Sequence, residues 1–202
     1  MKHLALLILP LAIAACSRSS EVRLSASYAA PDATLRVCSG YDCPIEERFS
    51  MREADRETIT AIMAKGAASP EAERAALRDA IAMMERIARR ELRFRPDVRL
   101  SWQRHRGKRG QMDCIDESTN TREYLTWMAA NGLLKHHTVL RSIAERGLIP
   151  GNWHPHKSAQ IKAPDGTAWV VDSWKGDDGE RPEIMRTAAW RVDSAPAGAY
   201  RP

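Results

Sequence analysis

The hydrophobic residues of this chain change their spacing part of the way along it. From Leu77 to Ile87 they recur every three or four positions, which places them on one face of an α-helix. Ser69-Pro70-Glu71 precedes them with an N-cap, a first-turn proline and an acid that complements the helix dipole. In the last third of the chain the hydrophobic runs are short and extended instead. Helices first and strands later predict an α+β domain.

Two more helices are predicted, one on each side of this segment. Ser50-Met51-Arg52-Glu53 has the pattern of a capping box and predicts a first helix that ends at about Lys65. A third helix is predicted over residues 114–130, with Asn131-Gly132 as a left-handed stop. Residues 95–110 are rich in Arg, Pro and Gly and show no periodicity, so they are predicted to form a loop.

The extended runs over residues 157–161 and 167–171 surround the turn signal Pro164-Asp165-Gly166 and predict an antiparallel hairpin. Its register decides which side chains share a face. With a five-residue loop over residues 162–166, His156 lies opposite Asp172 on the same face. With a two-residue loop, His156 lies opposite Lys175 instead, and Asp172 turns to the other face.

The first residues have the pattern of an export signal. A basic start is followed by an apolar run over residues 4–15, which is too short to span a bilayer. The run ends Ile13-Ala14-Ala15-Cys16, which resembles the bacterial lipobox and implies cleavage before Cys16 and a lipid on that cysteine. An ordinary signal peptide with a chance cysteine is the alternative. We therefore expect a signal peptide (1–15), a lipidated, flexible tether (16–34) and a single domain (35–202).

The predicted export and lipidation indicate which partners the protein has. The lipid on Cys16 would attach the protein to a membrane, and Ser17, by the same resemblance, implies the periplasmic face of the outer membrane in a bacterial cell envelope. The net charge is +5 and the pI is near 9.2, but the charged side chains are dispersed over the predicted helices. Nucleic acid is therefore not expected as a partner.

The remaining cysteines have distinct expected roles, because the compartment outside the cytoplasm, to which the chain is expected to be exported, favours disulfides. Cys38 and Cys43 flank a turn-forming Ser-Gly pair and are expected to form a local disulfide, with a metal site as the alternative. Cys114 is left without a partner at the start of a predicted helix, where partial positive charge lowers the pKa of a thiol. It is a candidate nucleophile, and a buried small hydrophobic residue is the alternative.

Three short motifs around these residues resemble a known family. Asp113-Cys114-Ile115-Asp116 opens a helix, His156 opens a strand, and Val170-Val171-Asp172 closes the next strand. In this order they are similar to the transglutaminase-like cysteine peptidases of bacteria, over roughly residues 111–174. The resemblance implies a papain-like fold, with N-terminal helices packed against a C-terminal antiparallel sheet. It also implies that Cys114 attacks a carbonyl carbon, His156 moves the proton and Asp172 orients the imidazole.

The same resemblance implies a function and one more site residue. The function is cysteine-dependent acyl transfer without a cofactor, in which a peptidase acts on envelope proteins or peptides. The family also uses a side chain as an oxyanion donor, for which Gln111 is the candidate and Trp102 the alternative. The family's Gly and Glu beside the cysteine are replaced here by Met112 and Ile115, so no metal site is assigned.

Other interpretations stay open. His154 competes with His156, although Pro155 between them disfavours regular pairing. Cys114 with both histidines would form the zinc site of a metal-dependent hydrolase. The chain would alternatively be a non-catalytic binding or scaffolding lipoprotein that keeps the same fold.

Two charged segments are expected to be solvated. His136-His137 follows the end of the third helix, where cations complement the helix dipole. The basic run over residues 104–109 is expected to be an exposed loop, and the alternative is that it attracts acidic substrates.

Overall fold

The computed structural model of the protein describes residues 34–99, 105–147 and 155–192. The predicted signal peptide and the lipidated Cys16 lie outside these residues. The described chain contains helices and antiparallel strands, which confirms the α+β class. In chain order the elements are β1 (Thr34–Ser39), β2 (Ile45–Ser50), α2 (Glu53–Ala64), α3 (Pro70–Leu92), α4 (Cys114–Ala130), β3 (Thr138–Val139), β4 (Ala144–Arg146), β5 (His156–Lys162), β6 (Ala168–Asp172), β7 (Glu183–Arg186) and α5 (Thr187–Val192).

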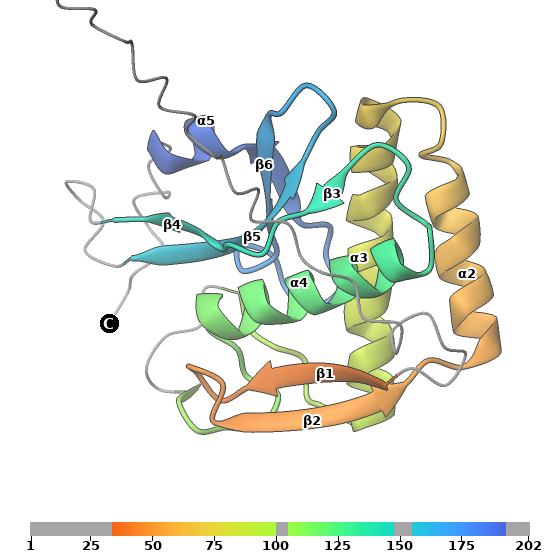
Figure 1. Ribbon diagram of the computed structural model, residues 1–202. Helices are drawn as coiled ribbons and strands as arrows, with labels where there is room; N and C mark the ends of the chain where they lie inside the picture. The colour runs from red at the N-terminus through yellow and green to blue at the C-terminus, as the bar shows by residue number, and fades with distance from the viewer. Residues whose placement is uncertain (1–33, 100–104, 148–154, 193–202) are drawn as a thin grey trace, which may run out of the picture.

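Helix α4 lies between two antiparallel sheets (Figure 1). The small sheet is the β1–β2 hairpin, and the larger one has the strand order β3-β5-β6-β7, with β4 also paired to β5. Leu125 and Met128 of α4 share one hydrophobic core with Val37 of β1 and Ile161 of β5. Helices α3 and α2 lie side by side at one end of α4 (Figure 1). Helix α4 is therefore packed against a sheet on each of two sides.

Helix α3 forms as its sequence predicts. The Ser69 hydroxyl accepts a hydrogen bond from the Ala72 N–H at 3.1 Å, and Pro70 is the first helical residue. Arg93 ends the helix in the left-handed conformation, with φ of 53°. The residues predicted to face the core are all buried: Leu77, Ala80, Ile81, Met84 and Ile87.

The predicted capping box at the start of α2 is wrong. Ser50 is the last residue of β2 and pairs with Thr34 of β1, so the cross-strand pairing holds it away from the helix. Arg52 is the N-cap, and its side chain makes no capping hydrogen bond. The core-facing residues Ile59 and Met63 are nevertheless buried, because the helical spacing does not depend on which residue caps the helix.

The predicted hairpin is present, but its register differs by two residues. Ala163 donates its N–H to Thr167 O at 2.9 Å, so the loop holds only residues 164–166, two fewer than expected. Ala159 therefore pairs with Val171, which places Ser158, not His156, level with Asp172. A shift of two residues keeps every side chain on its face. His156 and Asp172 consequently share a face as diagonal neighbours.

Candidate active site

Cys114 is the first residue of α4, and its neighbours fix the start of that helix. The Asp113 carboxylate accepts the N–H groups of Ile115 and Asp116, both at 3.0 Å. Asp116 in turn accepts the Asp113 N–H at 3.3 Å, which completes a capping box around the cysteine. The backbone direction at Cys114 is therefore defined by the two acids that flank it.

The loop between Cys38 and Cys43, here called the disulfide loop, holds the same two acids. The predicted disulfide is confirmed, and it uses both thiols that the alternative metal site would need. The N–H groups of Tyr41 and Cys43 donate to the two oxygens of Asp116, each at 2.7 Å. The Asp42 N–H donates to Asp113 at 3.2 Å. The first turn of α4 thus depends on a loop about 75 residues earlier in the chain.

His156 and Asp172 form a buried pair. Nε2 of His156 lies 2.8 Å from Oδ2 of Asp172, and the indole N–H of Trp190 donates to the same oxygen at 2.8 Å. Burial alone would raise the pKa of Asp172, but the hydrogen bonds and charge of its partners hold that pKa below its ordinary value. Because an ionised carboxylate only accepts, Nε2 carries the proton, and Nδ1 of a neutral ring keeps its lone pair.

Two indole rings enclose the imidazole. The ring centres of Trp174 and Trp190 lie 4.7 Å and 5.2 Å from that of His156. Nδ1 is buried, and among the described residues it has no hydrogen-bond partner. The Asp172 carboxylate and the His156 imidazole are therefore shielded from solvent, and Nδ1 of the imidazole is an acceptor that no described residue uses.

The sulfur of Cys114 lies against the backbone on both sides of His156. The thiol donates to the carbonyl oxygen of Pro155 at 4.0 Å, and the Lys157 N–H donates toward the sulfur. Backbone groups alternate in direction along a strand, and the Gln160 carbonyl accepts from Leu140 on the β3 side of β5. The backbone groups of residues 155 and 157 consequently point toward the side of β5 on which β6 lies. Because β6 ends at Asp172, it does not reach these groups, and Cys114 takes its place beside them.

The thiol is protonated at rest. Burial, together with the negative charges of Asp113 and Asp172, raises the pKa of Cys114 to about 11. The expected lowering by the helix N-terminus is thus outweighed, mainly by burial of the thiol and further by the negative charges of Asp113 and Asp172. A base must remove the proton when the sulfur reacts.

The structure gives no support to Gln111 as an oxyanion donor. Its amide nitrogen donates to Pro96 O at 3.0 Å, and its amide oxygen lies 2.8 Å from Nδ1 of His105. Both ends of the side chain are thereby used within the loop, and the oxyanion role stays a prediction. Trp102 and His154 lie outside the described residues. Within the described ranges, no three His, Cys, Asp or Glu side chains are placed to bind one metal ion.

The prediction that His136-His137 is a solvated pair is wrong for His137. This ring is buried, with Nδ1 2.7 Å from Glu73 of α3 and Nε2 3.1 Å from Arg74. Nothing in the local sequence indicates this contact, because its partners lie more than 60 residues earlier. Trp190 was likewise missed as a donor to Asp172, since a tryptophan at that position is equally typical of a plain core residue.

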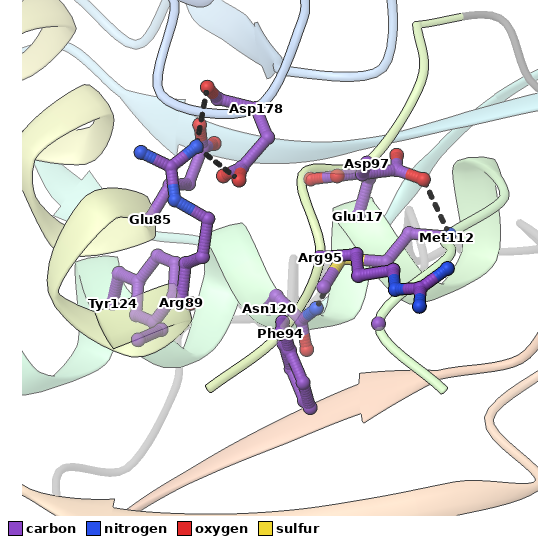
Figure 2. Close-up of a pocket in the computed structure, with 12 residues that line it drawn as sticks. Glu85, Arg89, Phe94, Arg95, Asp97, Met112, Glu117, Asn120, Tyr124 and Asp178 are labelled. Carbon is purple, nitrogen blue, oxygen red and sulfur yellow. Dashed lines mark hydrogen bonds and ion pairs between the residues drawn. The ribbon is translucent and has the colours of Figure 1, made fainter. Parts of the chain in front are cut away.

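A second group of ionisable side chains surrounds a small cavity lined by α3, α4 and two loops (Figure 2). Four carboxyl groups from α3, α4 and two loops line it: Glu85, Asp97, Glu117 and Asp178. Arg89 binds Asp178 at 2.7 Å, and the Gly179 N–H donates to Glu85 at 2.9 Å. Among the described residues, none of these four acids is a hydrogen-bond partner of Cys114 or His156.

Comparison of the chain with protein-family models, with curated proteins and with solved structures gives no match. In the described part of the chain no helix has the length and apolar character needed to cross a membrane. A functional assignment therefore depends on the site itself.

Proposed function

We propose that the protein is an exported, lipid-anchored, cysteine-dependent acyl-transfer enzyme with a transglutaminase-like, papain-like fold. Its reaction would be peptide hydrolysis in a bacterial envelope. The observation that carries this proposal is the buried pair of His156 and Asp172, whose unused Nδ1 belongs to the residue beside the Cys114 sulfur. A thiol thus lies beside the backbone of a residue whose imidazole is paired with a carboxylate, and we assign these groups the roles of nucleophile, base and orienting acid.

The proposed reaction uses these three residues in turn. Nδ1 of His156 removes the thiol proton as the Cys114 sulfur attacks a peptide carbonyl carbon. Asp172, ionised at neutral pH, keeps Nε2 protonated and stabilises the imidazolium that forms. The imidazolium then protonates the leaving amine, which leaves a thioester on Cys114. Water activated by His156 hydrolyses the thioester, whereas an amine in its place would give a crosslink.

Two features support the proposed location. The apolar run over residues 4–15 and the motif that ends at Cys16 are typical of an exported lipoprotein. The Cys38–Cys43 disulfide fits an oxidising compartment outside the cytoplasm. Envelope proteins or peptides are therefore the proposed substrates.

A second candidate function is a non-catalytic binding or scaffolding lipoprotein with the same fold. It is favoured by the protonated state of the thiol, because the pKa of Cys114 is raised to about 11 by burial. It is also favoured by Nδ1 of His156, which makes no hydrogen bond to the sulfur among the described residues. The two functions predict different thiol reactivity.

Alkylation of Cys114 by iodoacetamide separates the two functions. With His156 as the base, alkylation at pH 7 is expected to be about a hundredfold faster than in His156→Ala, which is the lower end of a general-base effect. The difference is expected to shrink as the pH approaches 11, where hydroxide removes the thiol proton in both proteins. Rates from pH 6 to pH 11, followed by mass spectrometry, give the comparison.

Two controls accompany this measurement. His136→Ala removes a histidine that contacts Ala67 instead of the sulfur, and it is expected to leave the rate unchanged. His156→Gln retains a hydrogen-bond donor for Asp172, so it is expected to stay folded while losing the base. Slow alkylation at pH 7, equal in wild type and both His156 variants, would reject the enzyme and favour the binding lipoprotein.

A further inference from the structure

A basic hollow lies beside the segment that leads into α4. Its volume is about 520 Å³, within the range of small-ligand sites. No carboxylate is among the described residues that line it. The side chains that give it its character are Arg95, His105, Lys108, Arg109 and Gln111.

The wall of the hollow is fixed by internal hydrogen bonds. Gln111 joins its two sides, since it bonds to both Pro96 and the His105 ring. Arg109 donates to Leu92 O at 2.7 Å and to Glu47 at 2.6 Å, and its guanidinium lies 4.8 Å from the Phe94 ring centre. A ligand therefore meets a preformed surface, which reduces the entropy cost of binding.

The positive charge of the hollow is only partly compensated. Glu47 neutralises Arg109, but neither Arg95 nor Lys108 has an acidic partner within the described ranges. Figure 2 shows the Arg95 side chain pointing away from Glu85 and Asp178. Two exposed cations at the edge of a concave surface attract anions and hold them by charge and hydrogen bonds.

The hollow lies within reach of the candidate nucleophile. Gln111, which lines it, is three residues before Cys114, so their Cα atoms are at most about 11 Å apart. An extended peptide advances about 3.3 to 3.6 Å per residue. A peptide bound with a carbonyl at the sulfur therefore reaches the hollow with a residue about three positions away.

We propose that this hollow is a specificity subsite that binds a carboxylate of an acidic peptide substrate, about three residues from the bond that Cys114 attacks. This inference rests on the proposed function and names its substrate class. Arg95 and Lys108 supply the charge, and the fixed ring of His105 and the guanidinium of Arg109 shape the wall.

Binding is tested apart from catalysis in a Cys114→Ala protein. The probes are two fluorescent hexapeptides of equal length, one rich in glutamate and the other with glutamine at the same positions, followed by fluorescence anisotropy at low salt. The glutamate peptide is expected to bind more tightly, and 150 mM salt is expected to weaken it. The double variant Arg95→Gln/Lys108→Gln is expected to lose about tenfold in affinity.

Arg106→Gln is the matched control, because Arg106 lies in the same turn and is exposed but does not line the hollow. It is expected to keep the affinity for the glutamate peptide. Equal binding of the two peptides, or equal losses in the control and the double variant, would overturn the subsite. The subsite would also be overturned if inorganic phosphate displaced the glutamate peptide and this peptide bound no more tightly than free glutamate. Alkylation of Cys114 in the wild type, compared with His156→Ala as above, tests the proposed function by itself, which separates failure of the subsite from failure of that function.

Discussion

Replacing Cys38 and Cys43 together by serine is expected to lower the free energy of unfolding by about 2 kcal/mol and to loosen the first turn of α4. The first effect follows from chain entropy, because the disulfide closes a loop in the unfolded chain, and a short loop gives a value at the lower end of the usual range. The second effect follows from the contacts of the disulfide loop. Its N–H groups supply two of the hydrogen bonds of Asp116, which is fully buried.

The backbone of the disulfide loop explains why these contacts depend on the covalent bond. Four residues in succession have positive φ: 92° at Gly40, 72° at Tyr41, 66° at Asp42 and 53° at Cys43. For residues other than glycine this conformation costs about 1–2 kcal/mol each. Without the disulfide, the loop can relax to negative φ, and its N–H groups then turn away from Asp116. A buried carboxylate that loses its donors is costly.

Two measurements check this result. Urea denaturation gives the change in stability, and amide hydrogen exchange of residues 114–117 reports on the first turn of α4. Both are made in a Cys114→Ser background, so that no free thiol exchanges with the disulfide. Reduction of the disulfide without substitution is the control for the serine side chains, and it is expected to reproduce the faster exchange. Unchanged exchange at residues 114–117 in the reduced protein would show that the loop does not support the helix start.

The helices show what local sequence is able to predict. The bounds of α3 and α4 follow from caps and spacing within a few residues, as with Ser69-Pro70 and with Asn131-Gly132. Such signals act over one or two turns, so no distant contact is needed to interpret them. Ser50 is the counterexample. The same capping pattern fails there because β1 competes for the residue.

The surroundings of α4 were beyond local prediction. Asn120 accepts the Cys38 N–H at 2.7 Å and donates to the Cys38 carbonyl at 2.9 Å. Its side-chain amide thus makes the two hydrogen bonds that the backbone of a neighbouring strand would make to β1. A helix with sheets on both sides buries polar residues that a one-faced pattern would assign to solvent. The β1–β2 hairpin was missed for the related reason that β2 alternates exposed charged residues with few apolar ones.

One part of the candidate site follows from local sequence, and the other depends on tertiary packing. That His156 and Asp172 share a face follows from the parity of a hairpin, which survives a register error of two residues. The position of the Cys114 sulfur beside Pro155 and Lys157 depends instead on how α4 packs on β5. The donor at Trp190 comes from a short helix after β7, whose place no periodicity indicates.

The stability of the folded protein is expected to fall as the pH rises from 5 to 8. Burial, with a contribution from the Asp178 charge, raises the pKa of Glu85 to about 8. Burial and the charges of Asp178 and Asp116 raise the pKa of Asp97 to about 7. Both groups belong to the cluster around the small cavity (Figure 2). The ordinary pKa values of these side chains, which apply in the unfolded chain, are near 4.

The sign follows from proton counting. Between about pH 4.5 and pH 8 the folded protein keeps a proton on Glu85 that the unfolded chain has released. The stability that this proton contributes is complete below about pH 4.5 and is lost as the pH rises through about 8. The limiting slope is about 1.4 kcal/mol per pH unit for each group, hence about 5 kcal/mol for Glu85 alone across the interval from about pH 4.5 to pH 8. The lowered pKa values of Asp172 and Glu73 act oppositely, but only in acid, below their ordinary values.

Thermal or urea midpoints measured at half-unit steps from pH 5 to pH 9 give the profile. Its slope is expected to decrease above about pH 8, where Glu85 has ionised, and to persist in part because burial also raises the pKa of Glu117 well above its ordinary value. Glu85→Gln keeps the shape of the side chain and cannot ionise, so its profile is expected to be flatter and its midpoint at pH 8 higher than that of wild type. Glu57→Gln removes an exposed carboxylate of α2 and is expected to keep the wild-type slope. A wild-type midpoint that does not change between pH 5 and pH 8, or a Glu85→Gln slope equal to that of wild type, would mean that Glu85 does not hold its proton. The cluster around the cavity would then have to be ionised in the folded protein, with Arg89 and its hydrogen-bond donors offsetting the charge.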